Sequence, residues 1–232
     1  AVDSRVCLSG GAAHHVTKVL RLSAGDKVTL FNGEGCDYFG LIHRLGAGVV
    51  EVHLLSVSPP EPRPALRIHL LQCLIRSEPM DFLLQKAVEL GVQRITPLFC
   101  RHSLIRFESG RLERRIEHWR ALTISACEQS GRRRLVELET PLTLDQIITK
   151  PPQGTLISLD PGVSATLASL SPPQEDIHLL IGPEGGMAEK EKEQIFLAGF
   201  LPVRLGPRTL RAETAPLAAI AAVQMLWGDF CD

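Results

Sequence analysis

HLLIGPEGG, residues 178–186, joins a short apolar run to a loop that contains three glycines and one proline. A continuous apolar run of this length is typical of a strand buried on both faces of a parallel sheet. The glycines allow a sharp turn and a close approach of main-chain N–H groups to a ligand. The loop lacks both Gly-Lys-Ser/Thr and GxGxxG, which excludes the usual phosphate and dinucleotide loops. Alone, it is as consistent with a tight structural turn as with a ligand loop.

A second glycine-containing loop, LGPRTLRAETA (205–215), follows the next apolar run and leads into a helix expected over 214–227. Ligands of open parallel sheets bind beyond the carboxyl ends of strands, so two such loops at neighbouring strand ends predict one ligand site. The alternatives are structural. Glu213 or Thr214 could cap the helix, and Arg211 could form only a surface ion pair.

Strand and helix patterns alternate through the second part of the chain. Strands are predicted over 66–74, 94–99, 155–159, 178–181 and 202–205, and helices over 80–90, 110–129, 188–198 and 214–227. Apolar strands that alternate with helices predict an α/β domain with a parallel sheet covered on both faces.

The first part of the chain has a different pattern, and four prolines within 58–64 separate it from the rest. Proline restricts the backbone and cannot donate to a strand ladder, so this stretch is typical of a linker. Before it, a short helix is expected over 12–21 and strands over 27–32, 36–45 and 49–57. We therefore predict a small β-rich module, a partly closed barrel, over 1–64 and an α/β domain over 65–232.

Composition excludes several classes of protein. The chain has 232 residues, 44% hydrophobic and 22% charged, which is unlike a disordered, collagen-like or coiled-coil protein. The longest apolar run, 215–227, is shorter than the ~20 residues that span a bilayer, and residues 1–10 lack the apolar core of a signal peptide. A soluble, cytoplasmic protein without a membrane segment is expected.

The six cysteines form no CxxC or CxH pair, so no metal site is expected. In a chain this long and apolar, buried free thiols are favoured over disulfides.

Charge is unevenly distributed although the net charge is only −1. Residues 101–134 hold nine arginines and four glutamates, whereas 135–232 hold six basic and thirteen acidic residues. This asymmetry indicates one basic face that could meet a polyanion, with a solvated helix face as the alternative.

Five stretches in order resemble the RsmE family of ribosomal RNA small subunit methyltransferases, which belongs to the SPOUT (α/β-knot) superfamily. They are HHVTKVLRLSAGDKVTLFNGEG (14–35), KAVELGV (86–92), ACEQSGR (126–132), LLIGPEGG (179–186) and LGPRTLRAETA (205–215). The resemblance implies a PUA-like β-barrel that binds RNA, followed by a SPOUT domain with a C-terminal trefoil knot. It further implies a homodimer that uses S-adenosylmethionine, without metal, to methylate N3 of one uridine in 16S ribosomal RNA, with the assembled small subunit as the expected substrate.

The family's cofactor pocket carries over to residues of the two loops and of one further strand end. These are Leu159, Ile181, Gly182, Pro183, Glu184, Gly185, Gly186, Leu205, Gly206, Leu210, Arg211, Thr214 and Ala215. Arg211 is the candidate for stabilising the uracil anion that forms when N3 loses its proton. Glu213 could accept that proton or orient a water, and capping the helix or holding Arg211 is the alternative. Arg21, Arg76, Arg132 and Arg133 are the candidate RNA contacts.

The chain departs from the family pattern at three places. His102 stands where relatives commonly have arginine, and Pro79 and Val136 also differ from the common residues. We expect these changes to lie away from the cofactor loops and to affect RNA contacts near 76–103. Two other functions remain open: a non-catalytic RNA-binding or ribosome-assembly protein, and a SPOUT enzyme that acts on transfer RNA.

Overall fold

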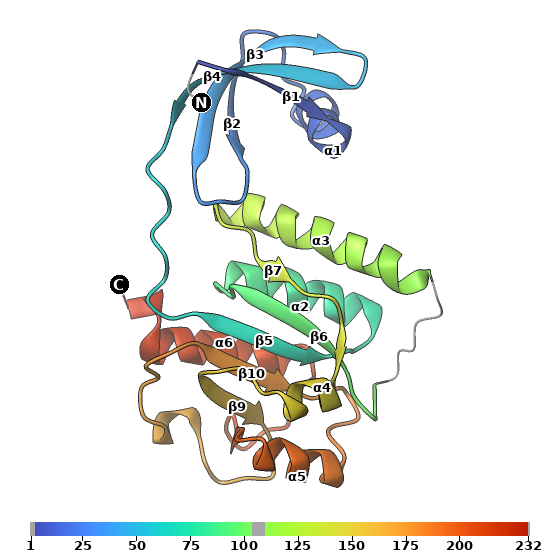
Figure 1. Cartoon of the computed structure of the whole chain (residues 1–232), viewed down its shortest axis with the longest axis vertical. Coiled ribbons are helices and arrows are strands. Elements are labelled where there is room, and N and C mark those ends of the chain that lie inside the picture. Colours follow the sequence, from blue (N-terminus) through green and yellow to red (C-terminus); the bar gives the residue numbers. More distant parts are fainter. Residues whose placement is uncertain (1–2, 104–109, 232) are drawn as a thin grey trace. The chain divides into compact units, whose positions relative to one another are not determined.

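The computed structural model describes residues 3–103 and 110–231, and the chain divides into two compact units (Figure 1). One unit comprises residues 1–62 together with 131–135, and the other comprises 63–130 and 136–232. The segment 131–135, which we expected in the α/β domain, packs in the first unit through main-chain hydrogen bonds. Gly35 N–H donates to the Arg133 carbonyl, and Leu135 N–H donates to the Gly33 carbonyl.

The first unit is an open antiparallel sheet of order β1-β4-β3-β2 with one helical segment (Figure 1). Its elements are β1 (Arg5–Ser9), α1 (Gly10–His14), a π-helical turn (His15–Val19), β2 (Lys27–Phe31), β3 (Asp37–Gly46) and β4 (Val49–Val57). Strands β1 and β2 are its edges, so the described residues form an open sheet rather than a closed barrel. The helical residues Ala13 and Val16 pack on Ile42, Val50 and Val52 to form the small core.

The second unit contains a parallel sheet of seven strands, as the alternating pattern predicts. The order is β11-β9-β10-β5-β6-β7, and β8 also pairs with β6. The strands are β5 (Ile68–Cys73), β6 (Arg94–Phe99), β7 (Glu137–Leu138), β8 (Leu142–Thr143), β9 (Thr155–Leu159), β10 (Ile177–Ile181) and β11 (Leu201–Val203). Every residue of β5 and β10 is buried, because helices cover both faces of the sheet.

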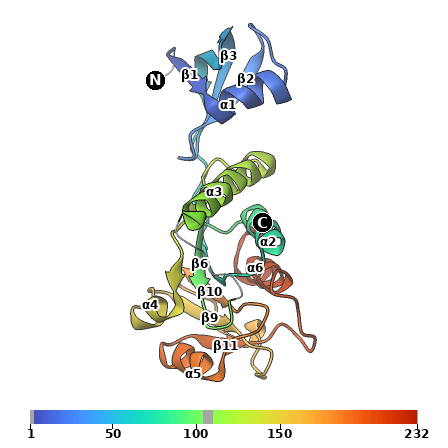
Figure 2. The same ribbon diagram turned by 90° about the vertical axis from the view of Figure 1, so that its right-hand side faces the viewer.

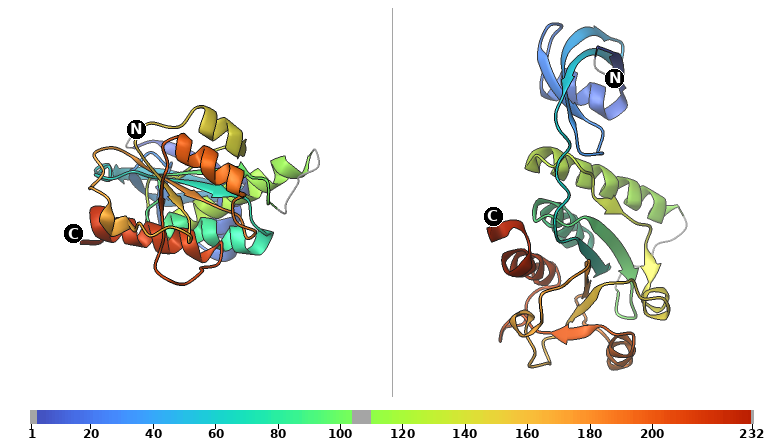
Figure 3. Two further views of the ribbon diagram at one scale, coloured as in Figure 1. Left: turned by 90° about the horizontal axis from the view of Figure 1, so that it is seen from below. Right: turned by 60° about the vertical axis from the view of Figure 1, so that its left-hand side comes forward.

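Helices α2 and α6 lie on one face of this sheet, and α4 and α5 lie on the other (Figures 2 and 3). The bounds are α2 (Ser77–Glu89), α3 (Arg111–Ser130), α4 (Leu144–Thr149), α5 (Glu189–Leu197) and α6 (Thr214–Trp227), with 3₁₀ turns at Leu167–Ser169 and Asp229–Cys231. On the α4/α5 face, Leu71 and Leu180 of the sheet pack with Ile147, Ile195 and Phe200. On the opposite face, α2 packs against α6, and α3 packs on α2.

One expectation about the cysteines was wrong, since Cys73 and Cys100 form a disulfide with a Cα–Cα distance of 6.0 Å. The pairing of β5 with β6 brings the two together at the carboxyl ends of adjacent strands, a proximity that spacing in the sequence does not reveal. Cys127 is buried as expected, but Cys7 is an exposed free thiol. Among the described residues, no helix is long and apolar enough to cross a bilayer, and no three His, Cys, Asp or Glu side chains converge as metal ligands.

Candidate cofactor and catalytic site

A cavity of about 700 Å³ lies where β9, β10 and β11 end. Its walls come from 158–163, 180–187 and 202–215, with Arg76 at the N-cap of α2 and Pro79 in the first turn of that helix. The two glycine loops therefore meet at one site, although their strands are not adjacent: β9 lies between β10 and β11 and contributes Leu159 and Asp160. Of the predicted cofactor residues, all line this cavity except Thr214.

The glycines of the two loops give the cavity main-chain walls. Gly186 N–H donates to the Pro183 carbonyl at 2.9 Å, which closes a tight turn. Gly186 and Gly206 have φ angles of +69° and +78°, and a side chain at either position would be strained. A cavity of this size and position suits a drug-sized ligand such as a nucleoside cofactor.

Glu184 points back from its loop to the start of α2. Its Oε1 accepts a hydrogen bond from the Arg76 N–H at 2.9 Å. Arg76 is the N-cap residue of α2 and makes no side-chain capping bond of its own. The carboxylate thus satisfies a helix-terminal donor and benefits from the positive end of the helix dipole.

His102 lies against the loop 182–186 and Pro79 lines the cavity, so the expectation that these two departures from the family pattern lie away from the loops was wrong. His102 Nδ1 is 3.1 Å from the Gly186 carbonyl, and its Cβ would be 3.2 Å from a Cβ built on Gly185. Because a carbonyl only accepts, Nδ1 carries the proton of this contact. Sequence reasoning missed the contact because the turn after β6 is 84 residues from its partner.

The two candidate catalytic side chains lie side by side at the entrance to α6. Arg211 Nη1 is 4.0 Å from Glu213 Oε1, and the side chains are 86% and 19% exposed, respectively. Glu213 is the N-cap residue but makes no side-chain capping bond. The first N–H groups of α6, those of Thr214 and Ala215, donate instead to the Arg211 carbonyl. Glu213 therefore does not cap the helix through its side chain, but it does lie close to Arg211.

Charged residues that sequence reasoning missed also line the cavity, among them Asp160, Lys192, Arg204 and Arg208. Lys192 Nζ is 3.0 Å from Glu189 and 3.5 Å from Asp160. The hydrogen bond that Lys192 donates to Glu189, together with the charge of Asp160, raises the pKa of Lys192 above its ordinary value. Because Asp160 directly follows β9, its position at the end of a predicted strand was the signal that could have identified it as a lining residue.

The candidate RNA contacts divide between the two units. Arg21, Arg132 and Arg133 belong to the first unit, and Arg76 belongs to the second. Arg21 is exposed and has a φ of +54°. The Arg133 guanidinium donates to Ser58 Oγ at 2.8 Å and to the Pro59 carbonyl at 3.1 Å, so part of its donor capacity holds the linker. Part of the arginine-rich stretch, 104–109, lies outside the described residues.

Comparisons with known proteins agree with this geometry. A family model described as an RNA methyltransferase domain matches residues 61–224, and one described as an RNA methyltransferase PUA domain matches 8–48. The ribosomal RNA small subunit methyltransferase E of Buchnera aphidicola is 34% identical over 229 residues, covering 98% of this chain and 93% of that protein.

Two solved structures are also similar over nearly the whole chain. A methyltransferase of Legionella pneumophila in complex with S-adenosylmethionine has a TM-score of 0.95 and 36% identity, covering 99% of this chain and 95% of that one. The ribosomal RNA small subunit methyltransferase E of Neisseria gonorrhoeae, bound to S-adenosylmethionine, has a TM-score of 0.92 with the same identity and coverage.

Proposed function

Because this chain belongs to the ribosomal RNA small subunit methyltransferase E family, we propose that it methylates N3 of one uridine in 16S ribosomal RNA with S-adenosylmethionine. The observation that carries the proposal is the cavity of about 700 Å³ at the ends of β9, β10 and β11, lined by both glycine loops. The substrate we propose is the assembled small subunit in the cytoplasm.

The residues of the cavity fit the cofactor. Main-chain groups of 181–186 and 205–211 would hold it, and side chains at Gly186 or Gly206 would strain these walls. The cofactor, when bound, supplies a methyl group that is already electrophilic because it is attached to a sulfonium, so the protein does not have to activate that group. The protein's own task is to align uracil N3 with that methyl group and to exclude water.

Uracil N3 has a weakly acidic N–H and no nucleophilic lone pair until that proton leaves. A cation near O2 or O4 would stabilise the developing anion, and Arg211 is an exposed cation among the residues that line the cavity. An arginine cannot serve as the base at neutral pH. Glu213, less exposed and 4.0 Å from the guanidinium, would either accept the proton or hold Arg211 in place.

RNA recognition would use the first unit and the segment before α2. Residues 8–48 match an RNA methyltransferase PUA domain. Arg21, Arg76, Arg132 and Arg133 are the proposed contacts, and a near-neutral chain favours local, shape-dependent recognition of folded RNA.

The proposed homodimer would bury the exposed apolar residues at the end of α6. Met225 and Leu226 are 60% and 46% exposed, and Phe230 just beyond the helix is 48% exposed. Exposed apolar side chains gathered at one helix end are typical of an interface. Light scattering at micromolar concentration tests this point, and a monomer would contradict it.

Methyl transfer from radiolabelled S-adenosylmethionine tests the function directly. Small subunits, free 16S RNA and transfer RNA are offered in parallel, and the labelled nucleoside is identified after digestion. We expect label in N3-methyluridine from the small subunit. Label in transfer RNA would favour the alternative SPOUT enzyme, and calorimetry without cofactor binding would favour a non-catalytic assembly protein.

A further inference from the structure

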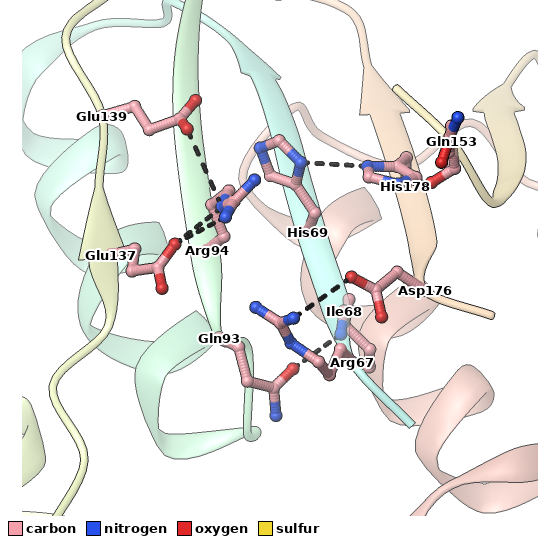
Figure 4. A network of polar contacts seen from close by, with 10 residues as sticks. All are labelled: Arg67, Ile68, His69, Gln93, Arg94, Glu137, Glu139, Gln153, Asp176 and His178. Carbon is pink, nitrogen blue, oxygen red and sulfur yellow. Dashed lines mark hydrogen bonds and ion pairs between the residues drawn. The ribbon is translucent and has the colours of Figure 1, made fainter. Parts of the chain in front are cut away.

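Two buried histidines face each other on the two adjacent central strands of the parallel sheet. His69 in β5 and His178 in β10 are register partners, and they are only 7% and 4% exposed. Their Nδ1 atoms are 3.0 Å apart, and the rings meet edge to face at 71° (Figure 4). They lie near the amino ends of their strands, at the opposite end of the sheet from the glycine loops.

The outer nitrogen of each ring also has a polar partner. His69 Nε2 is 2.7 Å from Thr96 Oγ1 in β6, and the Thr96 hydroxyl donates to Glu139 Oε2. His178 Nε2 is 2.8 Å from the Gln153 carbonyl (Figure 4). A chain of four contacts thus runs from Glu139 through Thr96, His69 and His178 to Gln153.

The partners at the two ends fix the position of each proton. A carbonyl only accepts, so His178 carries a proton on Nε2. The Glu139 carboxylate, 3.7 Å from the Arg94 guanidinium, also accepts, so the single Thr96 hydrogen points to it. Thr96 must then accept from His69 Nε2–H. A neutral imidazole has only one N–H, and both are now assigned, so the two Nδ1 atoms face each other with lone pairs.

We propose that His69 and His178 form a binding site for one proton, shared between their Nδ1 atoms and empty while both imidazoles are neutral. Uptake of a proton converts a contact between two acceptors into an N–H···N hydrogen bond between β5 and β10. The one contact of the chain that lacked a hydrogen, between His69 and His178, is then satisfied, and the buried acceptors are no longer opposed.

The surroundings determine how many protons the pair accepts. Arg67, just before β5, and Arg94 in β6 are positive, while Asp176, just before β10, is the acidic group near His178 and is 3.6 Å from Arg67 (Figure 4). Glu137 forms an ion pair with Arg94. Apolar residues of α4 cover this face of the sheet. Burial, then the neighbouring His178, lowers the pKa of His69 to about 3, and burial also lowers the pKa of His178. One proton on the pair therefore excludes a second.

The strands joined by this proton are those that lead to the site. Strand β10 continues into the loop 182–186, and β5 continues toward Arg76, whose N–H binds Glu184. The pair is accordingly a pH-sensitive link between the two central strands.

Imidazole nitrogen spectra of the folded chain test the proposal, with assignments taken from His69→Gln and His178→Gln variants. At neutral pH we expect both rings as Nε2–H tautomers with unprotonated Nδ1 atoms. On acidification both rings should shift together in one transition that takes up a single proton. An Nδ1–H on either ring at neutral pH, or two separate transitions, would overturn the proposal.

Thr96→Val provides a matched test, because valine keeps the shape and removes the hydroxyl that fixes the His69 tautomer. We expect the His69 proton to move to Nδ1 and donate to His178, so that the shared acid transition is lost. Thr29→Val, in β2 of the first unit, is the control and should leave both rings unchanged. A His69 tautomer that stays at Nε2 in Thr96→Val would also overturn the assignment.

Discussion

The carboxylate of Glu184 accepts a hydrogen bond from the Arg76 N–H at 2.9 Å, across 108 residues of sequence. It ties the loop after β10 to the first turn of α2, and both partners line the cavity. The hydrogen bond therefore serves two purposes at once: it caps a helix and it fixes one wall of the proposed cofactor site.

Replacing Glu184 should weaken both the helix start and cofactor binding. Loss of an N-cap acceptor costs about 1 kcal/mol, which in a chain of this size lowers the melting temperature by about 2–4 °C. We expect Glu184→Ala to show this shift and to bind S-adenosylmethionine about fivefold more weakly in calorimetry, the equivalent of about 1 kcal/mol.

Glu184→Gln keeps an acceptor oxygen and should recover most of the loss. Glu128→Ala, an exposed residue of α3, is the control for a lost surface carboxylate and should change neither quantity. If Glu184→Ala matches that control in both measurements, the hydrogen bond does not hold the loop.

Sequence alone could predict the elements whose apolar pattern is long and bounded by glycine or proline. Strands over 49–57, 94–99 and 155–159 and the helix over 214–227 have the predicted bounds. By contrast, β1, β7, β8 and α4 were not predicted. A two-residue strand such as β7 forms only because a neighbouring strand pairs with it. For α4, the only signal in the sequence is the Thr143–Gln146 capping box, which is too short to predict a helix.

The candidate site could be predicted from the sequence where it depends on loop composition, but not where it depends on contacts between residues distant in the chain. The glycine loops signal exposed main chain by themselves. Neither the His102–Gly186 contact nor the Glu184 bond follows from local pattern, because each requires the order of strands in the sheet. That order, with β9 between β10 and β11, arises from non-local parallel pairing. The trefoil knot implied by the family resemblance stays a prediction.

Asp81 should be a stability determinant of the contact between α2 and α3. One of its oxygens binds Arg115 Nη2 at 2.9 Å and Trp119 Nε1 at 3.2 Å, and the other binds His118 Nε2 at 2.8 Å. Since hydrogen bonds to a charged group contribute about 1.5–3 kcal/mol, we expect Asp81→Ala to lower the free energy of unfolding in urea by about 2 kcal/mol.

Asp81→Asn retains one acceptor for Arg115 or Trp119 and should lose about half as much. Glu117→Ala, which removes an exposed carboxylate from α3, should change stability little. Equal losses for Asp81→Ala and Glu117→Ala would contradict this assignment.

Stability should fall as the solution is acidified, because His69 and His178 are harder to protonate in the folded chain. The pKa of His69 is lowered to about 3 by burial, against an ordinary value of 6.5. The unfolded chain therefore binds the proton first, and the contribution of His69, complete above pH 6.5, declines as pH falls toward its folded pKa. From about pH 7.5 to about pH 5, His69 alone should cost about 2 kcal/mol.

The measurement compares slopes of unfolding free energy against pH, so that a general loss of stability does not matter. His69→Gln should have the shallower slope, and His43→Gln, an exposed histidine of β3, should retain the original slope. Parallel slopes for all three proteins would mean that His69 titrates alike in the folded and unfolded chains.

Arg211 should act on the chemical step rather than on cofactor binding. Its side chain lines the cavity and is 86% exposed, so it can approach a uracil oxygen, whereas the glycine loops contribute main-chain walls. Removal of one preorganised electrostatic stabiliser typically costs about two to three orders of magnitude in rate. We expect Arg211→Ala to lose at least about 100-fold in single-turnover methylation of small subunits, with cofactor affinity in calorimetry unchanged.

Two further variants decide between the roles of the neighbouring residues. Arg208→Ala removes another cavity-lining arginine and should retain most of the single-turnover rate, which controls for a general loss of positive charge. Glu213→Gln keeps the shape near Arg211 but cannot accept a proton as a carboxylate does. A loss that shrinks as pH rises would favour Glu213 as the base, because hydroxide replaces it, and a pH-independent loss would favour positioning of Arg211. If Arg211→Ala turns over normally, or slows only because it no longer binds cofactor, Arg211 is a wall of the pocket and has no part in the transfer.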